Sequence, residues 1–310
     1  MLTIPRLAAL GYCGVSFPKG IKKIMLLRYI YALILSMLSL TIKAEEISEY
    51  RISGTEIVTI SSGINKQDYE LYIKLPRNYS QTKKNYPVAI LSDTGFSFPI
   101  ASGVVGLMGG RDIEDLILVG ISYSKGSSSE ISRTRDYTPT FAPDEKGAHS
   151  LEAQKYSGKA FQYLEFLEKE VFPLISQKYR IDVDNKIYIG HSFGGLLGAY
   201  TLLVKPELFQ KYIIGSPSLW YDEGAIFRLE EAYAKKNKAM NATVFMYIGS
   251  EENKNNHKSM VDDVLLFEKI LKNRQYKGLT FNAYVLDGET HFSVFSLLLT
   301  DGLKKAIPKG

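Results

Sequence analysis

Strand-like segments alternate with helix-like segments along most of the chain, and this order limits the fold more than any other feature. PVAILSD (87–93) and DLILVGIS (115–122) are continuous apolar runs, typical of parallel strands covered by helices on both faces. Two earlier segments, 55–62 and 69–76, alternate apolar and polar residues and predict antiparallel strands at one edge of the sheet. Later strands are predicted at 186–190, 212–217, 243–250 and 279–288, with helices at roughly 153–179, 193–204, 223–238, 257–274 and 291–306. We therefore expect an α/β protein with a mostly parallel central sheet, antiparallel opening strands and helices on both faces.

The N-terminus has a different composition from the rest of the chain. Segment 19–28 is basic and segment 29–42 is almost wholly apolar, and a small residue, Ala44, precedes an acidic start. This order is typical of a signal peptide. The apolar run is short for a membrane-spanning helix because Arg28 interrupts it, although an anchor is the alternative. Met25 is a second possible start, since a complete signal peptide follows it.

We accordingly predict a leader over residues 1–44 and one domain over residues 45–310, in a periplasmic or secreted protein without stable membrane insertion after cleavage. The net charge of +5 is small, and the basic residues are scattered, which argues against a nucleic-acid partner. The single cysteine, Cys13, lies in the leader, so the mature chain would have no disulfide and no thiol nucleophile.

The segment Gly190-His191-Ser192-Phe193-Gly194 matches the pattern G-x-S-x-G and joins a predicted strand directly to a predicted helix. A tight turn at this place would lift the Ser192 hydroxyl above the sheet, and the flanking glycines would remove Cβ atoms that collide. The backbone N–H of Phe193 would face a developing oxyanion. Ser192 could instead only cap the helix, but a simple cap does not require glycines on both sides. The pattern therefore predicts that Ser192 is a nucleophile.

A serine nucleophile needs a base, and the sequence has four histidines. His191 lies inside the elbow, His149 in a polar loop, and His257 at the start of a charged helix. His291 follows the last predicted strand and precedes the last helix, which fits the chain order serine, acid, histidine. We predict that His291 is the base.

The acid should follow the strand that lies between serine and histidine. That strand, 243–250, is followed by two adjacent carboxylates, Glu251 and Glu252. We favour Glu252 because the acid often comes a few residues beyond the strand, and Glu251 is the alternative. A second oxyanion donor should follow the strand 87–93, where Gly95 and Phe96 are the candidates.

Several motifs, taken in order, resemble one family of proteins. They are YPVAILSDTGFSFP, LVGISY, RTRDYTPT (133–140), GHSFGG, SPSLWYD (216–222), IGSEE and GETHFSVF. The chain resembles the esterase group of α/β hydrolases, which includes siderophore esterases of the enterobactin-hydrolase type and S-formylglutathione hydrolase. The resemblance implies the α/β-hydrolase fold and a cofactor-independent esterase with a Ser-His pair, whose acid is sometimes poorly placed or absent in siderophore-hydrolysing members. The family usually has Asp-Gly-Asn/Asp where this chain has Asp93-Thr94-Gly95, which bears on the second oxyanion donor.

Three further residues are candidates for substrate binding. Arg133 and Arg135 would lie on one side of an extended segment, where both could face a substrate with anionic oxygens. Alternatively, they pair with Asp136 and nearby carboxylates to fasten the loop. Trp220 would line the cleft or pack in the core.

The leading hypothesis is hydrolysis of a small-molecule ester through an acyl-enzyme, without metal or cofactor. A siderophore lactone is one candidate substrate, and simple acyl or aryl esters are the alternative. An acyltransferase would share every catalytic residue and differ in excluding water. A noncatalytic binding module of the same fold is the alternative from another class, although such a protein has no reason to retain serine, histidine and acid together.

Overall fold

The computed structural model describes residues 19–38, 49–147, 149–253 and 260–310. The chain divides into two units, Met1–Tyr50 and Arg51–Gly310. The first unit contains helix α1 (Lys19–Leu38), whereas Cys13 and Ala44 lie outside the described residues, as does His257. Within the described ranges, no helix has both the length and the apolar character needed to cross a membrane. Cleavage of a leader stays a prediction.

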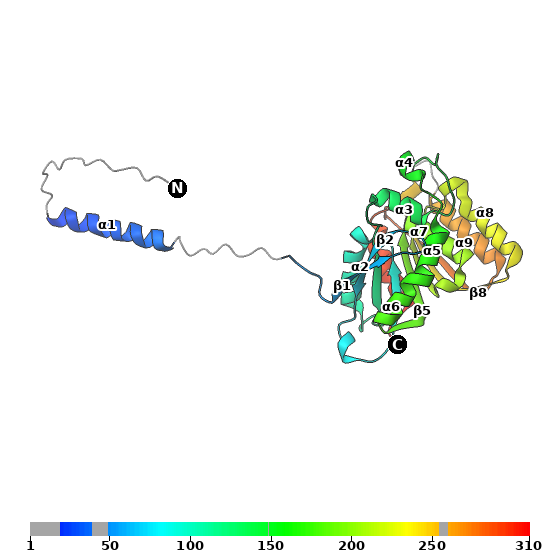
Figure 1. The fold of residues 1–310 in the computed structure, drawn as a ribbon, viewed down its shortest axis with the longest axis horizontal. Helices are drawn as coiled ribbons and strands as arrows, with labels where there is room; N and C mark the ends of the chain where they lie inside the picture. Colours follow the sequence, from blue (N-terminus) through cyan, green and yellow to red (C-terminus); the bar gives the residue numbers. More distant parts are fainter. Residues whose placement is uncertain (1–18, 39–48, 148, 254–259) are drawn as a thin grey trace. The chain divides into compact units, whose positions relative to one another are not determined.

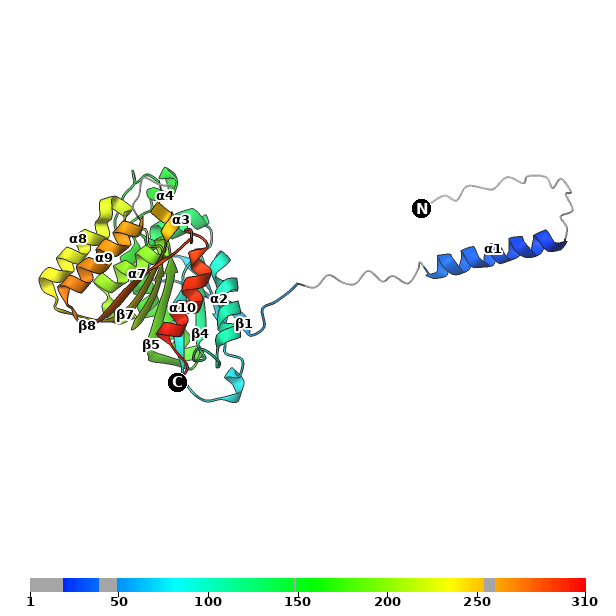
Figure 2. The ribbon, with the colours of Figure 1, turned by 180° about the vertical axis from the view of Figure 1, so that it is seen from behind.

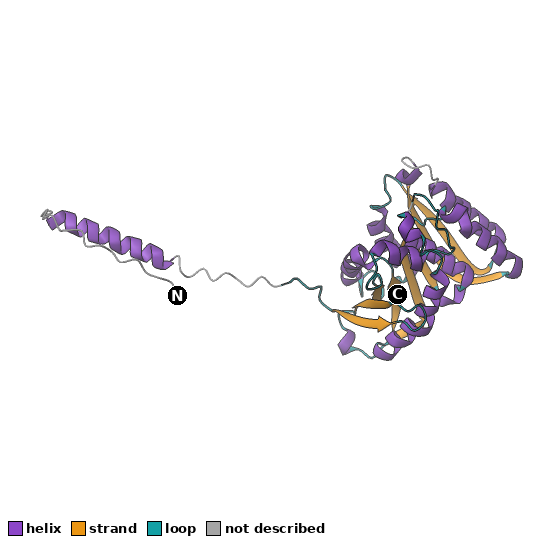
Figure 3. Ribbon diagram, turned by 45° about the horizontal axis from the view of Figure 1, so that its top comes forward, coloured by secondary structure: helices purple, strands orange, loops and turns teal. Residues whose placement is uncertain are grey.

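The second unit is built on one mixed sheet, in which the structure describes eight strands in the order β1-β2-β4-β3-β5-β6-β7-β8. Strand β2 pairs antiparallel with β1 and β4, and all the other pairs are parallel. Figure 3 shows the sheet between its helices. The mostly parallel sheet with antiparallel opening strands is confirmed. The strand bounds are β1 Thr55–Ser61, β2 Asp68–Lys74, β3 Tyr86–Leu91, β4 Ile117–Ile121, β5 Ile181–His191, β6 Lys211–Gly215, β7 Ala239–Gly249 and β8 Lys277–Leu286.

Helices cover both faces of this sheet and bury two separate apolar cores. Helices α5 to α9 pack on the face seen in Figure 1, and α2 and α10 on the face seen in Figure 2. Helix α3 packs against α4, α5 and α7. The bounds are α2 Thr94–Met108, α3 Ser129–Tyr137, α4 Leu151–Gln154, α5 Ala160–Phe166, α6 Phe172–Lys178, α7 Phe193–Val204, α8 Tyr221–Lys236, α9 Met260–Arg274 and α10 Val294–Ala306.

Two helices of the second unit were not predicted, and one predicted helix is divided. Helix α2 contains Pro99 and several glycines, which are poor helix formers, but it buries an apolar face against the sheet. Helix α3 occupies the segment that we expected to be extended, and it begins where the Ser128 hydroxyl accepts the Ile131 N–H at 3.2 Å. The predicted helix 153–179 is interrupted near Gly158, whose φ of +84° lies in the left-handed region.

Candidate active site

The turn between β5 and α7 has the strained geometry expected of a nucleophile elbow. Ser192 adopts φ 58° and ψ −116°, a conformation that residues with a side chain rarely adopt. A Cβ atom at Gly190 would overlap the Gly194 carbonyl, and one at Gly194 would overlap the Ser92 hydroxyl. The Ser192 N–H donates to the carbonyl of Gly215 at 2.9 Å. The two glycines therefore permit the turn, and the hydrogen bond to β6 holds it in place.

The side chains of His291 and Glu252 meet at the carboxyl ends of β7 and β8. Glu252 lies in a short 3₁₀ turn after β7 and is 7% exposed, and its Oε2 accepts a hydrogen bond from His291 Nδ1 at 2.7 Å. Its Oε1 accepts from the Ser216 hydroxyl at 2.6 Å and from the Gly249 N–H at 2.9 Å. Burial alone would raise the pKa of Glu252, but these three hydrogen bonds outweigh burial and lower the pKa below 4.5. An ionised Glu252 fixes the His291 tautomer with its proton on Nδ1, which leaves the lone pair on Nε2.

The neighbouring Glu251 has a different environment. Its backbone N–H donates to the carbonyl of Glu289 at 3.0 Å, which ties the turn after β7 to the loop that carries His291. Of the two adjacent carboxylates, Glu252 is the one whose hydrogen bond to His291 is observed.

His191, the residue before the serine, fastens the His291 loop to the elbow. Its Nε2 donates to the carbonyl of His291 at 2.6 Å, and the two rings lie 4.6 Å apart. Burial, with a smaller effect of His291, lowers the pKa of His191 to about 3, so the ring is neutral. Phe295 packs between His191 and Phe96 at centroid distances of 5.8 Å and 5.3 Å, and Phe292 packs on His291 at 5.5 Å. A continuous row of rings thus includes His291, and only the two ends of the row, Phe96 and Phe292, are strongly exposed. This role of His191 was not predicted from the sequence, in which only its place inside the elbow points to a function.

The candidate oxyanion donors lie at the N-termini of two helices. Gly95 and Phe96 are in the first turn of α2, and Phe193 is the first residue of α7. N–H groups in the first turn of a helix lack intrahelical partners and carry partial positive charge. The elbow at Gly194 packs directly on Ser92 and Asp93 after β3, so the residues that precede α2 are in contact with the first turn of α7.

Arg133 lies beneath the elbow in a buried ion pair. Its Nε donates to Asp93 Oδ1 at 2.7 Å and its Nη2 to Asp93 Oδ2 at 3.1 Å, and Nη2 also donates to the His191 carbonyl at 3.2 Å. The Tyr123 hydroxyl donates to Asp93 Oδ1 at 2.8 Å. The carboxylate links the ends of β3 and β4 to the elbow, a role that the sequence analysis missed.

The two arginines do not share a face, so the prediction of an extended segment was wrong. Residues two apart on a helix point in different directions. Arg135 pairs with Asp136 at 2.8 Å, and these contacts match the alternative in which both arginines fasten the segment. Trp220 packs 6.3 Å from the Phe193 ring, and His149, which sequence reasoning passed over as a loop residue, packs at 4.7 Å from the same ring.

The fold and the site define a class of protein. A strained serine lies between a parallel strand and a helix, and the residue before it is hydrogen-bonded to the loop of a histidine that a buried carboxylate holds. These features are those of the serine hydrolases of the α/β-hydrolase type. The sequence model of the family described as "Putative esterase" matches residues 61–306, and the chain belongs to this family. The predicted family is thereby confirmed. The protein is a serine esterase that acts on carboxylic ester bonds.

Individual relatives agree with this assignment. The chain is 28% identical over 266 residues to ferri-bacillibactin esterase BesA of Bacillus subtilis (strain 168), which covers 83% of this chain and 91% of the relative. Among solved structures, an IroE-like serine hydrolase from Shewanella oneidensis is 30% identical with a TM-score of 0.72, covering 81% of this chain and 79% of the other. The BES protein from Bacillus cereus is 25% identical with a TM-score of 0.73, covering 86% of this chain and all of the other.

Proposed function

We propose that this esterase hydrolyses the ester bonds of a siderophore through an acyl-enzyme on Ser192. The observation that carries the catalytic assignment is the 2.7 Å hydrogen bond from His291 Nδ1 to the buried Glu252 carboxylate, on a loop that His191 fastens to the serine elbow. This bond orients the imidazole so that its Nε2 can accept the serine proton. The siderophore is proposed because the relative from Bacillus subtilis is a ferri-bacillibactin esterase.

The proposed reaction has two stages, acylation and deacylation, and in each stage His291 first accepts a proton and then returns it. As the Ser192 oxygen attacks the ester carbonyl, His291 Nε2 takes the hydroxyl proton, and the N–H groups of Phe193 and of Gly95 or Phe96 stabilise the oxyanion. The C–O bond to the alcohol then breaks, and His291 returns the proton to the leaving oxygen. Water attacks the acyl-enzyme, loses its proton to His291, and the acid departs as Ser192 regains its hydrogen. Glu252 stays ionised throughout and stabilises the imidazolium.

Covalent labelling tests the nucleophile. Incubation with a fluorophosphonate probe should label the protein once, at Ser192, and Ser192→Ala should abolish both the label and ester turnover. A matched control is Ser218→Ala, which alters a neighbouring buried serine outside the proposed machinery and should keep the label. A label at another residue, or none in folded protein, would refute the assignment.

A substrate panel tests the siderophore. Ferric and iron-free catecholate lactones should be hydrolysed with a higher kcat/KM than p-nitrophenyl acetate. Turnover of the simple ester alone would remove the siderophore from the proposal, and transfer of the acyl group to an added alcohol in preference to water would indicate an acyltransferase.

We also propose that residues 1–44 direct export to the periplasm or the medium, because their basic-then-apolar order and small residue at the end are those of a signal peptide. Expression of the full chain in a bacterial host, followed by fractionation and N-terminal sequencing, should find a protein in the exported fraction that begins at Glu45. Retention of the full-length chain in the membrane fraction would instead support an anchor.

A further inference from the structure

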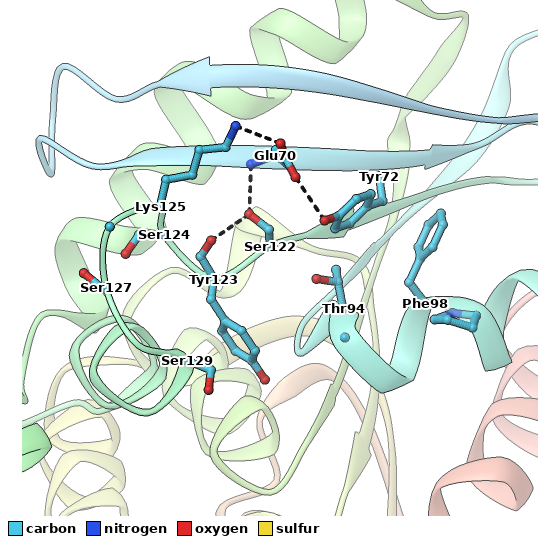
Figure 4. A pocket seen from close by; sticks show the side chains of 13 residues that line it. Glu70, Tyr72, Thr94, Phe98, Ser122, Tyr123, Ser124, Lys125, Ser127 and Ser129 are labelled. Atoms are coloured by element: carbon cyan, nitrogen blue, oxygen red, sulfur yellow. Dashed lines mark hydrogen bonds and ion pairs between the residues drawn. The ribbon is translucent and has the colours of Figure 1, made fainter. Parts of the chain in front are cut away.

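A pocket beside the start of α2 shares Gly95 with the mechanism above, and its other lining residues have no role in that mechanism. It has a volume of about 540 Å³ and lies between β2, the start of α2 and the segment that joins β4 to α3. Figure 4 shows Thr94 and Phe98 on one side of it and Lys125, Ser127 and Ser129 on the other. This volume is within the range of about 300–1,000 Å³ that is usual for small-molecule sites. We infer that the pocket binds one hydroxyl-bearing aryl arm of the substrate, an assignment that rests on the proposed siderophore esterase function.

The pocket borders the place where the ester reacts. Thr94 and Gly95 line it, and they directly follow Asp93, on which the serine elbow packs. Tyr123, another lining residue, donates its hydroxyl to Asp93, which is held in turn by Arg133 beneath the elbow. A group bound in the pocket therefore lies next to the proposed oxyanion donors. Hydrogen bonds through Asp93 and Arg133 connect the lining residue Tyr123 to the turn that carries the nucleophile.

The lining combines flat apolar surfaces with polar groups, as an aryl ring bearing hydroxyls requires. The rings of Tyr72, Phe98 and Tyr123 supply surfaces against which a planar group can pack. The hydroxyls of Ser127 and Ser129 lie across the pocket from Phe98 (Figure 4). Serine hydroxyls both donate and accept hydrogen bonds, and can therefore pair with phenolic groups in either direction.

Lys125 adds a cation at the rim. Its Nζ lies 2.7 Å from Glu70 Oε1, and its side chain is 51% exposed. The hydrogen bond from Lys125, with another from Tyr72, lowers the pKa of Glu70, so the pair is ionised. Because a lysine ammonium has three donors, Lys125 can keep its bond to Glu70 and also donate to a phenolic oxygen. The rim therefore favours an aryl arm that carries acidic hydroxyls over a plain hydrocarbon chain.

Filling the pocket tests this inference without requiring siderophore turnover. The probe is 2,3-dihydroxy-N-benzoylglycine, a single hydroxyaryl arm, used as an inhibitor of p-nitrophenyl acetate hydrolysis. In Ser127→Trp the inhibition constant should rise at least about tenfold, the effect of losing a well-fitted pocket contact, while kcat/KM for the small ester changes by less than about twofold. Lys125→Gln should raise the inhibition constant by a smaller factor. Ser80→Trp, at an exposed serine in the turn Tyr79–Gln81 outside the pocket lining, is the matched control and should leave the inhibition constant unchanged.

Different outcomes test the assignment of the pocket and the proposed siderophore substrate. An unchanged inhibition constant in Ser127→Trp, or no inhibition of the parent enzyme, overturns the assignment of the pocket. Failure of the parent to hydrolyse any siderophore overturns the proposed substrate, and it leaves the pocket assignment standing if the inhibition constant still rises in Ser127→Trp.

Discussion

Replacing His191 by glutamine removes a titrating group from beneath the catalytic loop. In the parent, the neutral imidazole donates from Nε2 to the His291 carbonyl and is only 4% exposed. A glutamine amide can donate the same hydrogen bond without taking up a proton in this pH range. The variant therefore isolates the cost of protonating a buried histidine from the cost of losing its hydrogen bond.

The expected size follows from the pKa of His191, which is about 3 in the folded protein and about 6.5 in an unfolded chain. Between these two values the unfolded state binds the proton and the folded state does not, so stability falls as the pH falls. At pH 5 this linkage costs the parent about 2 kcal/mol relative to pH 8. The cost approaches its limit only below the folded pKa.

Urea unfolding at pH 8, 6.5 and 5, followed by the fluorescence of Trp220, measures this difference. We expect the free energy of unfolding of His191→Gln, measured relative to the parent, to increase by about 2 kcal/mol between pH 8 and pH 5, because only the parent is destabilised by the proton uptake. A difference that does not change with pH would show that His191 is not a buried neutral group. His191→Leu, which cannot donate to His291, should also lower kcat, and His191→Gln should restore most of it.

Three further changes probe the site directly. Glu252→Gln should lower kcat by roughly 10²- to 10⁴-fold because the histidine tautomer is no longer fixed, whereas Glu251→Gln should stay within about threefold; equal losses would contradict the assignment. Arg133→Met should destabilise the fold by about 3–5 kcal/mol because it leaves the buried Asp93 carboxylate without its ion-pair partner. Thermal unfolding measures this loss, and an altered KM with an unchanged Tm would instead indicate that Arg133 binds the substrate. Gly249→Ala should displace the loop before His291, since the new Cβ would overlap a backbone carbonyl of that loop, and lower kcat by about 10²-fold; unaltered kinetics would refute this reasoning.

Local patterns in the sequence were enough to predict the sheet and the elbow. Continuous apolar runs such as 115–122 are strands because they are covered on both faces, and burial on both sides leaves a strong signal in composition. The turn at Ser192 was predictable because the chain must pass from strand to helix there with glycines on both sides. Both signals depend only on residues that are close in sequence.

Helix α2 and helix α3 were not predictable in the same way. The first contains Pro99 and glycines that local propensity disfavours in a helix, and its packing against the sheet overrides that propensity. Helix α3 is rich in charged residues, and its Arg133 forms an ion pair with Asp93, which lies forty residues away in the sequence. Packing between distant segments decided both, and no local pattern records it.

The sequence by itself determined the order of strands and helices, the serine at the elbow and the one histidine in the right place along the chain. Only the tertiary structure decided which of two adjacent carboxylates contacts His291. The choice depends on the turn after β7, where Ser216, which follows β6, and Gly249, the last residue of β7, donate hydrogen bonds to the Glu252 carboxylate. Adjacent residues share the same sequence neighbourhood, and only the direction of each side chain in three dimensions distinguishes them.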